Sequence, residues 1–271
     1  MIRFRRSEIA ILDACRLLGV SRSQYYRKAL PTRAPDLALE AIALEHPRFG
    51  YRRLAVLLGR PTKVVRVQMS KLGLMAKRIR KRKLVHKSIP IEAENLSFKA
   101  LETGQLLASD FTYIALSSGQ TGYFAVTLDV YSRRILGWNF CRNMSKTLVI
   151  SALERAIANV NLSEHWLHHS DRGSQYTSVE FQSCVLASSG HLSYSYPASP
   201  QENAYLESFF SRFKDEVVSV RETLNFEDTL MEITEFVSYY NENRPHSSLG
   251  NLSPLAFERI KTEQILQESV A

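Results

Sequence analysis

The chain has 271 residues, and its 45% hydrophobic and 23% charged content is ordinary for a water-soluble globular protein. No apolar run is long enough to span a bilayer, and Glu8 and Asp13 interrupt the Arg-rich start, which is unlike a signal peptide. We therefore expect a cytoplasmic protein with no membrane partner. Its cysteines, Cys15, Cys141 and Cys184, lie far apart, which argues against a disulfide framework and against a zinc cluster.

Positive charge is concentrated in the first third of the chain. Residues 1–88 contain 22 Lys and Arg against 5 acids, a net charge of +17, so the remainder carries −9 and the whole chain +8. Between residues 46 and 91 there are 14 Lys or Arg and no acid. Such a segment suits a phosphate polyanion, because a row of cations neutralises phosphates without reading the sequence of bases.

Residues 9–27 predict two short helices joined by a tight turn. Gly19 supplies the turn and Ser21 the N-cap of the second helix. This is a helix-turn-helix outline, which we assign to residues 1–32. The side chains expected to face DNA are Arg22, Gln24 and Arg27.

A second small helical module, expected to bind DNA, is assigned to residues 33–76. Residues 47–73 predict another helix pair, in which Thr62 caps a helix that runs to Leu72 and Gly73 stops it. The candidate DNA contacts of this module are Arg52, Arg53, Lys63 and Arg66.

Residues 77–104 have the composition of a basic linker. We expect the start of this segment to be unstructured when free and to contact DNA phosphates when bound. Its candidate contacts are Lys77, Arg78, Arg80, Lys81, Arg82 and Lys83.

Residues 105–245 alternate between strand and helix patterns. Strands are expected at 106–116, 123–128, 134–140, 166–170 and 191–194, and helices at 145–160, 179–188 and 200–218. That order predicts an α/β fold with a mixed five-stranded sheet covered on both faces, in which the first and fourth strands can be neighbours. Residues 246–271 are assigned to a C-terminal tail.

Three acids in this region have the setting of metal ligands. Asp110 is the one charge within an apolar strand, and a buried charge needs a partner. Asp171 follows the fourth strand, and the carboxyl ends of strands are where open α/β sheets bind ligands. Glu207 lies on a predicted helix with Lys214 two turns further on, so that face could hold a metal and grip a phosphate. Three carboxylates can hold two Mg²⁺ ions, which suit chemistry on a phosphodiester.

Five strings resemble the catalytic core of bacterial insertion-sequence transposases, in the branch closest to retroviral integrases. They are DFTYI at 110–114, DVYSRRILGW at 129–138, HSDRGSQYTS at 169–178, QENAYLESFF at 201–210 and YNENRPHSSL at 240–249. The resemblance covers nearly the whole chain and includes the gap of 35 residues between the second and third acids. It implies a ribonuclease H-like core and an Asp-Asp-Glu triad.

The resemblance further implies a DNA transposase of the downstream-frame type. Asp110, Asp171 and Glu207 would be both the catalytic residues and the metal ligands, with two Mg²⁺ ions per site and Mn²⁺ able to substitute. The implied reaction is strand cleavage at element ends followed by strand transfer into target DNA. The implied partners are double-stranded DNA, as terminal inverted repeats and as target, further copies of the chain, and a companion protein from an upstream frame. The expected location is the bacterial cytoplasm, at the nucleoid.

Two other functions remain open from the sequence. One is a DNA-binding regulator derived from a transposase that no longer cuts, although three retained acids argue against it. The other is a nuclease of the same fold that does not join ends. A recombinase with a tyrosine nucleophile is disfavoured, because no Arg-His-Arg cluster precedes Tyr239 or Tyr240, which we interpret as helix-packing residues.

Overall fold

The computed structural model describes residues 36–74, 76, 100–195, 204–218 and 224–270, together with residues 15, 16, 19 and 21. Most of the expected helix-turn-helix and most of the basic linker lie outside the described residues, so those assignments remain predictions. Within the described part, no helix has both the length and the apolar character needed to cross a membrane.

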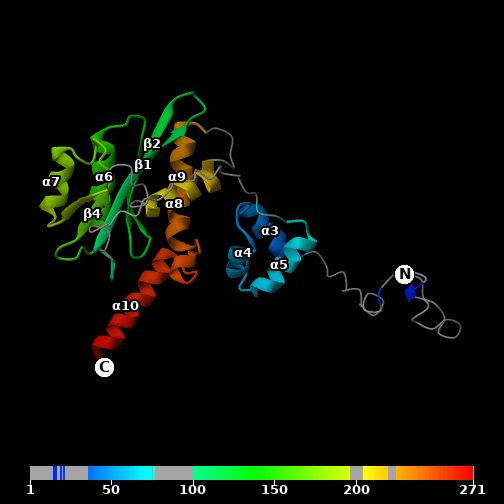
Figure 1. The fold of residues 1–271 in the computed structure, drawn as a ribbon. Helices are drawn as coiled ribbons and strands as arrows, with labels where there is room; N and C mark the ends of the chain where they lie inside the picture. The colour runs from blue at the N-terminus through cyan, green and yellow to red at the C-terminus, as the bar shows by residue number, and fades with distance from the viewer. Residues whose placement is uncertain are drawn as a thin grey trace.

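The central feature is a mixed five-stranded sheet (Figure 1). Its strands are β1 (Leu106–Ala115), β2 (Thr121–Asp129), β3 (Ile135–Cys141), β4 (Leu167–Ser170) and β5 (His191–Tyr194). They lie in the order β3-β2-β1-β4-β5, with β2 antiparallel to both β1 and β3, and β4 parallel to both β1 and β5. The predicted mixed sheet, and the adjacency of its first and fourth strands, are confirmed.

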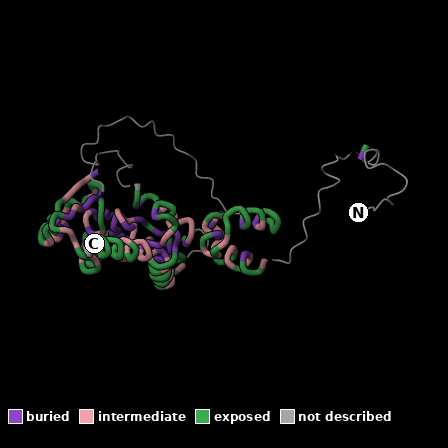
Figure 2. Tube along the Cα trace, turned by 90° about the horizontal axis from the view of Figure 1, so that it is seen from below, coloured by how far each residue is buried: buried purple, intermediate pink, exposed green. Residues whose placement is uncertain are grey.

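Helices cover both faces of the sheet, as predicted. One face carries α6 (Lys146–Ala158) and α7 (Val179–Ala187), and the other carries α8 (Ala204–Phe213) and α9 (Phe226–Glu242). Side chains of β1 alternate between the two faces: Leu107 packs with α6 and α7, whereas Leu106 and Ala108 pack with α8 and α9. The central strand is therefore held by two apolar cores, which form the buried interior in Figure 2.

Two local predictions are wrong in detail. The helix expected from 200 to 218 is α-helical within the described residues only over α8, and then becomes a π-helix, η2 (Lys214–Val218). The widened turn places Glu216 against the buried Arg244. In α5 (Thr62–Lys71), Pro61 occupies the N-cap position and Thr62 is already helical. The predicted stop is confirmed, because Gly73 adopts a φ of 67°, a conformation that only glycine takes without steric cost.

Three short helices form a second, smaller core. They are α3 (Leu37–Glu45), α4 (Tyr51–Leu57) and α5 (Thr62–Lys71). Leu39, Leu54 and Val65 are fully buried between them. Asp36 caps α3 by accepting a hydrogen bond from the backbone N–H of Leu39. We call α3, α4 and α5 together the helical module.

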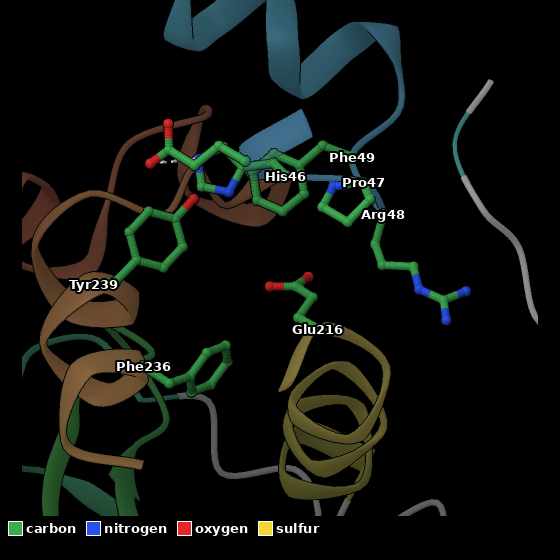
Figure 3. Close-up of a pocket in the computed structure, with 8 residues that line it drawn as sticks. His46, Pro47, Arg48, Phe49, Glu216, Phe236 and Tyr239 are labelled. Carbon is green, nitrogen blue, oxygen red and sulfur yellow. Dashed lines mark ion pairs between the residues drawn. The ribbon is translucent and has the colours of Figure 1, made fainter. Parts of the chain in front are cut away.

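We call the five-stranded sheet and the helices that cover it the sheet body. The helical module docks on this sheet body through Glu216 of η2. Arg244, which is 1% exposed, donates to both carboxylate oxygens of Glu216 at 3.0 and 2.7 Å. Arg53 of α4 donates to the same carboxylate at 3.4 Å. Figure 3 shows Glu216 and Tyr239 pointing toward the module loop that carries His46, whose ring stacks on Tyr239 at 5.3 Å. One carboxylate therefore binds arginines from both bodies.

Arg53→Met is expected to loosen this docking. The substitution keeps an unbranched apolar side chain next to Phe49 but removes the charge that reaches Glu216. A partly buried pair of this kind contributes about 1 kcal/mol, so amide exchange in α4 and η2 should accelerate by roughly fivefold. Arg52→Met, the same substitution at the exposed neighbouring position, is the matched control and should leave exchange unchanged. Equal protection of α4 and η2 in all three proteins would contradict this role of Arg53.

The segment assigned to a C-terminal tail contains a long helix. A short 3₁₀ turn, η3 (Ser247–Leu249), leads to α10 (Pro254–Val270). The start of α10 is fixed to the sheet body, because Glu258 accepts from Arg134 at 3.0 Å and Phe257 contacts the ring of Tyr131. The rest of α10 projects away from the sheet (Figure 1).

Candidate active site

Asp110 and Asp171 come from neighbouring parallel strands. The register between β1 and β4 pairs Leu107 with His168 and Ala108 with His169. Continuing that register by two places sets Asp110 opposite Asp171, which directly follows β4. The two aspartates therefore meet where β4 ends, as the carboxyl-end rule predicts.

Glu207 approaches the same place from α8. Leu206 and Phe210 on this helix are buried against the sheet, whereas Glu207 is exposed at the rim of the buried face. The buried residues fix how α8 lies across the sheet, and the rim position leaves the carboxylate of Glu207 in contact with solvent. Asp171 is also exposed, and Asp110 is partly buried.

The charges of these acids are coupled. The pKa of Asp110 is raised to about 7: burial is the largest cause and the charges of Asp171 and Glu207 add to it, against the lowering effects of the Phe111 backbone N–H and of Lys214. A carboxyl group with this pKa is half protonated near neutral pH. The pKa of Asp110 therefore depends on the charges of Asp171, Glu207 and Lys214.

Hydrogen bonds hold the strand ends that carry the two aspartates. His168 Nε2 and Ser109 Oγ share a hydrogen bond of 2.8 Å in the buried interior, and burial lowers the pKa of His168 to about 3, so its ring is neutral. His169 lies between the hydroxyls of Ser193 and Ser195, at 3.0 Å from each. Both histidines therefore support the β4 end.

The side chain of Asp171 is fixed by the turn that follows it. Its Oδ1 accepts from the backbone N–H of Gly173 at 2.9 Å. A Cβ on residue 173 would lie 2.9 Å from that oxygen, so glycine permits the close turn. Asp110 Oδ1 similarly accepts from Phe111 N–H at 2.8 Å. In both residues one carboxylate oxygen is oriented by the backbone.

The donor set fits a hard divalent cation. All three groups are carboxylates, which Mg²⁺ prefers, and the mutual repulsion that raises the pKa of Asp110 would be relieved by a cation between them. In the described ranges, no three His, Cys, Asp or Glu side chains already form a closed cluster that could hold a metal ion.

The predicted DNA contacts divide into four groups. Arg52, Lys63 and Arg66 are exposed on the helical module, and Lys214 lies next to the acids. Arg53 is engaged with Glu216, so a DNA contact would compete with docking. The contacts that fall outside the described residues are Arg22, Gln24, Arg27, Lys77, Arg78, Arg80, Lys81, Arg82 and Lys83.

One neighbour of the acids was missed by sequence reasoning. Tyr176 is fully buried, its hydroxyl has no hydrogen-bond partner within the described structure, and burial and then the charges of Asp110 and Asp171 raise its pKa. Its position five residues after Asp171 was a signal of proximity, but strand and helix patterns do not reveal which way a loop side chain points.

The match to known folds centres on the sheet body. A sequence model described as integrase core domain matches residues 100–200, and a second with the same description matches residues 190–254. A chain of the simian T-cell lymphotropic virus intasome, in complex with PP2A regulatory subunit B56 gamma, has the same fold, with a TM-score of 0.51 at 15% identity over 82% of this chain and 74% of that chain. The HTLV-2 integrase catalytic core domain in complex with magnesium matches at a TM-score of 0.43 and 14% identity, over 59% of this chain and 99% of that chain. The fold is therefore that of an integrase core.

Curated relatives identify the family. The transposase for insertion sequence element IS904 of Lactococcus lactis is 32% identical over 233 residues, covering 82% of this chain and 92% of that protein. The transposase InsF for insertion sequence IS3A of Escherichia coli is 31% identical over 280 residues, covering 95% of this chain and 96% of that protein. The chain belongs to the IS3 family of insertion-sequence transposases. DNA binding is implied by that membership.

Proposed function

We propose that this chain cuts the ends of an insertion sequence and joins them to target DNA, with Asp110, Asp171 and Glu207 as metal ligands. One observation carries the proposal most directly: Asp110 is a largely buried acid on the central strand, and after burial itself the charges of Asp171 and Glu207, which come from different elements, raise its pKa. Surface acids without a shared role do not require such coupling. Family membership supports the reaction class.

Mg²⁺ bound to the three acids, in two ions with Mn²⁺ able to substitute, would activate the attacking oxygen and stabilise the leaving oxygen of a phosphodiester. The chain's own part is to hold the carboxylates and the DNA. The turn at Gly173 orients Asp171, the Phe111 N–H orients Asp110, and α8 carries Glu207 and leads directly to Lys214. Lys214 is placed to neutralise a phosphate next to the acids. The attacking group is first water, and then the freed 3′ hydroxyl of the element end.

The proposed division of labour follows the order of the chain. Residues 1–32 and 33–76 bind DNA, residues 77–104 connect them to a catalytic core at 105–245, and residues 246–271 are the C-terminal tail that carries α10. The exposed cations of the helical module, Arg52, Lys63 and Arg66, suit a duplex partner. Joining paired ends requires at least two copies of the chain on DNA, and an upstream-frame companion would add further end recognition.

The test uses the purified chain, Mg²⁺ and a labelled duplex carrying the terminal inverted repeat that flanks its gene, with a plasmid as target. The proposal expects nicking at the repeat end, followed by attachment of label to the plasmid, and no activity in EDTA. Binding without nicking, unaffected by Asp171→Asn, would favour a regulator. Nicking with no labelled plasmid would favour a nuclease that does not join.

A further inference from the structure

Beyond Asp110, the described residues leave one edge of β1 without a partner strand. β4 pairs with β1 only as far as Ala108, whereas β1 continues to Ala115 with β2 along its other edge. No strand among the described residues pairs with the β4-side edge of residues 109–115. The backbone groups of β1 after Asp110 therefore have no strand partner on this side among the described residues.

An exposed aromatic ring projects from this open stretch. Tyr113 is 66% exposed, although Thr112 and Ile114 on either side of it are buried. The ammonium of Lys214 lies 4.8 Å from the centre of the Tyr113 ring, within the range of a cation–π contact. Lys214 also acts on Asp110, whose pKa its charge lowers. An exposed aromatic ring is thus in contact with a cation whose charge acts on Asp110.

We propose that Tyr113 and Lys214 form a binding site for one unpaired nucleotide of the DNA strand at the acids, with the base stacked on Tyr113 and its phosphate neutralised by Lys214. This inference rests on the proposed function, because it requires a DNA strand beside Asp110. Every base has a π-face, so such a site tolerates any sequence and suits a strand end that is frayed before cutting or joining.

A second aromatic–cation pair provides a matched control. The guanidinium of Arg133 lies 3.8 Å from the ring centre of Tyr205, which is 43% exposed. Arg133 follows β2, whose last residue pairs with Leu107 near the start of β1, so this pair lies at the opposite end of β1 from Tyr113. The two pairs have the same chemistry but lie at different places. A comparison of their variants therefore separates general DNA affinity from base stacking on Tyr113.

The experiment measures stacking without catalysis. A short oligothymidylate with one 2-aminopurine is titrated with the full chain in EDTA, because stacking on an aromatic ring quenches the fluorescence of that base. Wild type and Tyr113→Phe should quench it, whereas Tyr113→Leu should lose the quench and bind roughly tenfold more weakly. Lys214→Gln should weaken binding and flatten its salt dependence while the quench at saturation persists. Tyr205→Leu should behave as wild type.

The proposed nucleotide site would be contradicted if a folded Tyr113→Leu variant still quenched the fluorescence. It would also be contradicted if Tyr205→Leu lost the quench to the same extent. Circular dichroism of each variant establishes that it is folded. Since no metal and no cleavage enter the titration, the two proposals can fail separately. Quenching that depends on Tyr113 in a chain that never cuts DNA would leave the site standing and remove the reaction. DNA cutting without such quenching would remove the nucleotide site and leave the proposed reaction standing.

Discussion

Replacing Asp110, Asp171 or Glu207 by the matching amide is expected to abolish DNA cleavage and joining while DNA binding stays close to wild type. Each amide keeps the shape of the side chain but removes the negative charge that a divalent cation needs. Metal ions contribute several kcal/mol to a phosphodiester transition state, and about 1.4 kcal/mol corresponds to tenfold, so a loss of roughly a thousandfold or more should follow. Affinity depends mainly on cations elsewhere in the chain, and it should survive.

The rates are measured on a labelled element-end duplex with saturating Mg²⁺, and binding is measured by gel shift in the same buffer. Glu180→Gln is the control, because this exposed acid pairs with Lys146 between α6 and α7, away from the proposed site. That variant should cut at the wild-type rate. A full rate in any of the three amide variants would remove that residue from the site, and a parallel loss of binding would point to misfolding instead.

Much of the sheet body could be predicted because local pattern and chain order constrain it together. Three strands joined by short turns must form a meander, and a strand that follows a crossover helix can only join that sheet at an open edge. Asp110 could be assigned because a charge in an apolar strand is costly without a partner. The proximity of Asp171 then followed from its place after β4.

Other features of the structure depend on contacts that no periodic pattern encodes. Glu216 binds Arg244 and Arg53, which lie 28 and 163 residues away in the sequence. Charged residues are usually solvated, so their sequence gives no reason to pair these three. The exposure of Tyr113 was hidden for a different reason. An apolar run predicts a buried strand along its whole length, and it does not show where the covering layer on one face of the sheet ends.

Asp110→Asn is expected to stabilise the metal-free protein, and more so as the pH rises. Burial first, and then repulsion by Asp171 and Glu207, raise the Asp110 pKa from 3.8 to about 7 in the folded state. The folded protein therefore holds a proton that the unfolded chain has already lost. That contribution to stability is fully present below about pH 4 and is lost as the pH rises through about 7. Asparagine does not ionise, so its advantage over wild type should grow across that window to at most a few kcal/mol.

Urea unfolding near pH 5 and near pH 8, in EDTA and in Mg²⁺, measures both this effect and the proposed metal site. In EDTA the advantage of the variant over wild type should be clearly larger near pH 8 than near pH 5. Mg²⁺ should stabilise wild type near pH 8 and less near pH 5, because the cation must displace the proton on Asp110. The variant should respond weakly to Mg²⁺ at both pH values. Equal Mg²⁺ stabilisation of the two proteins would place the cation elsewhere, and an Asp110→Asn advantage that shrinks with rising pH would contradict the raised pKa. Because this readout involves no DNA, it tests the acids as a cation site independently of the reaction proposed for them.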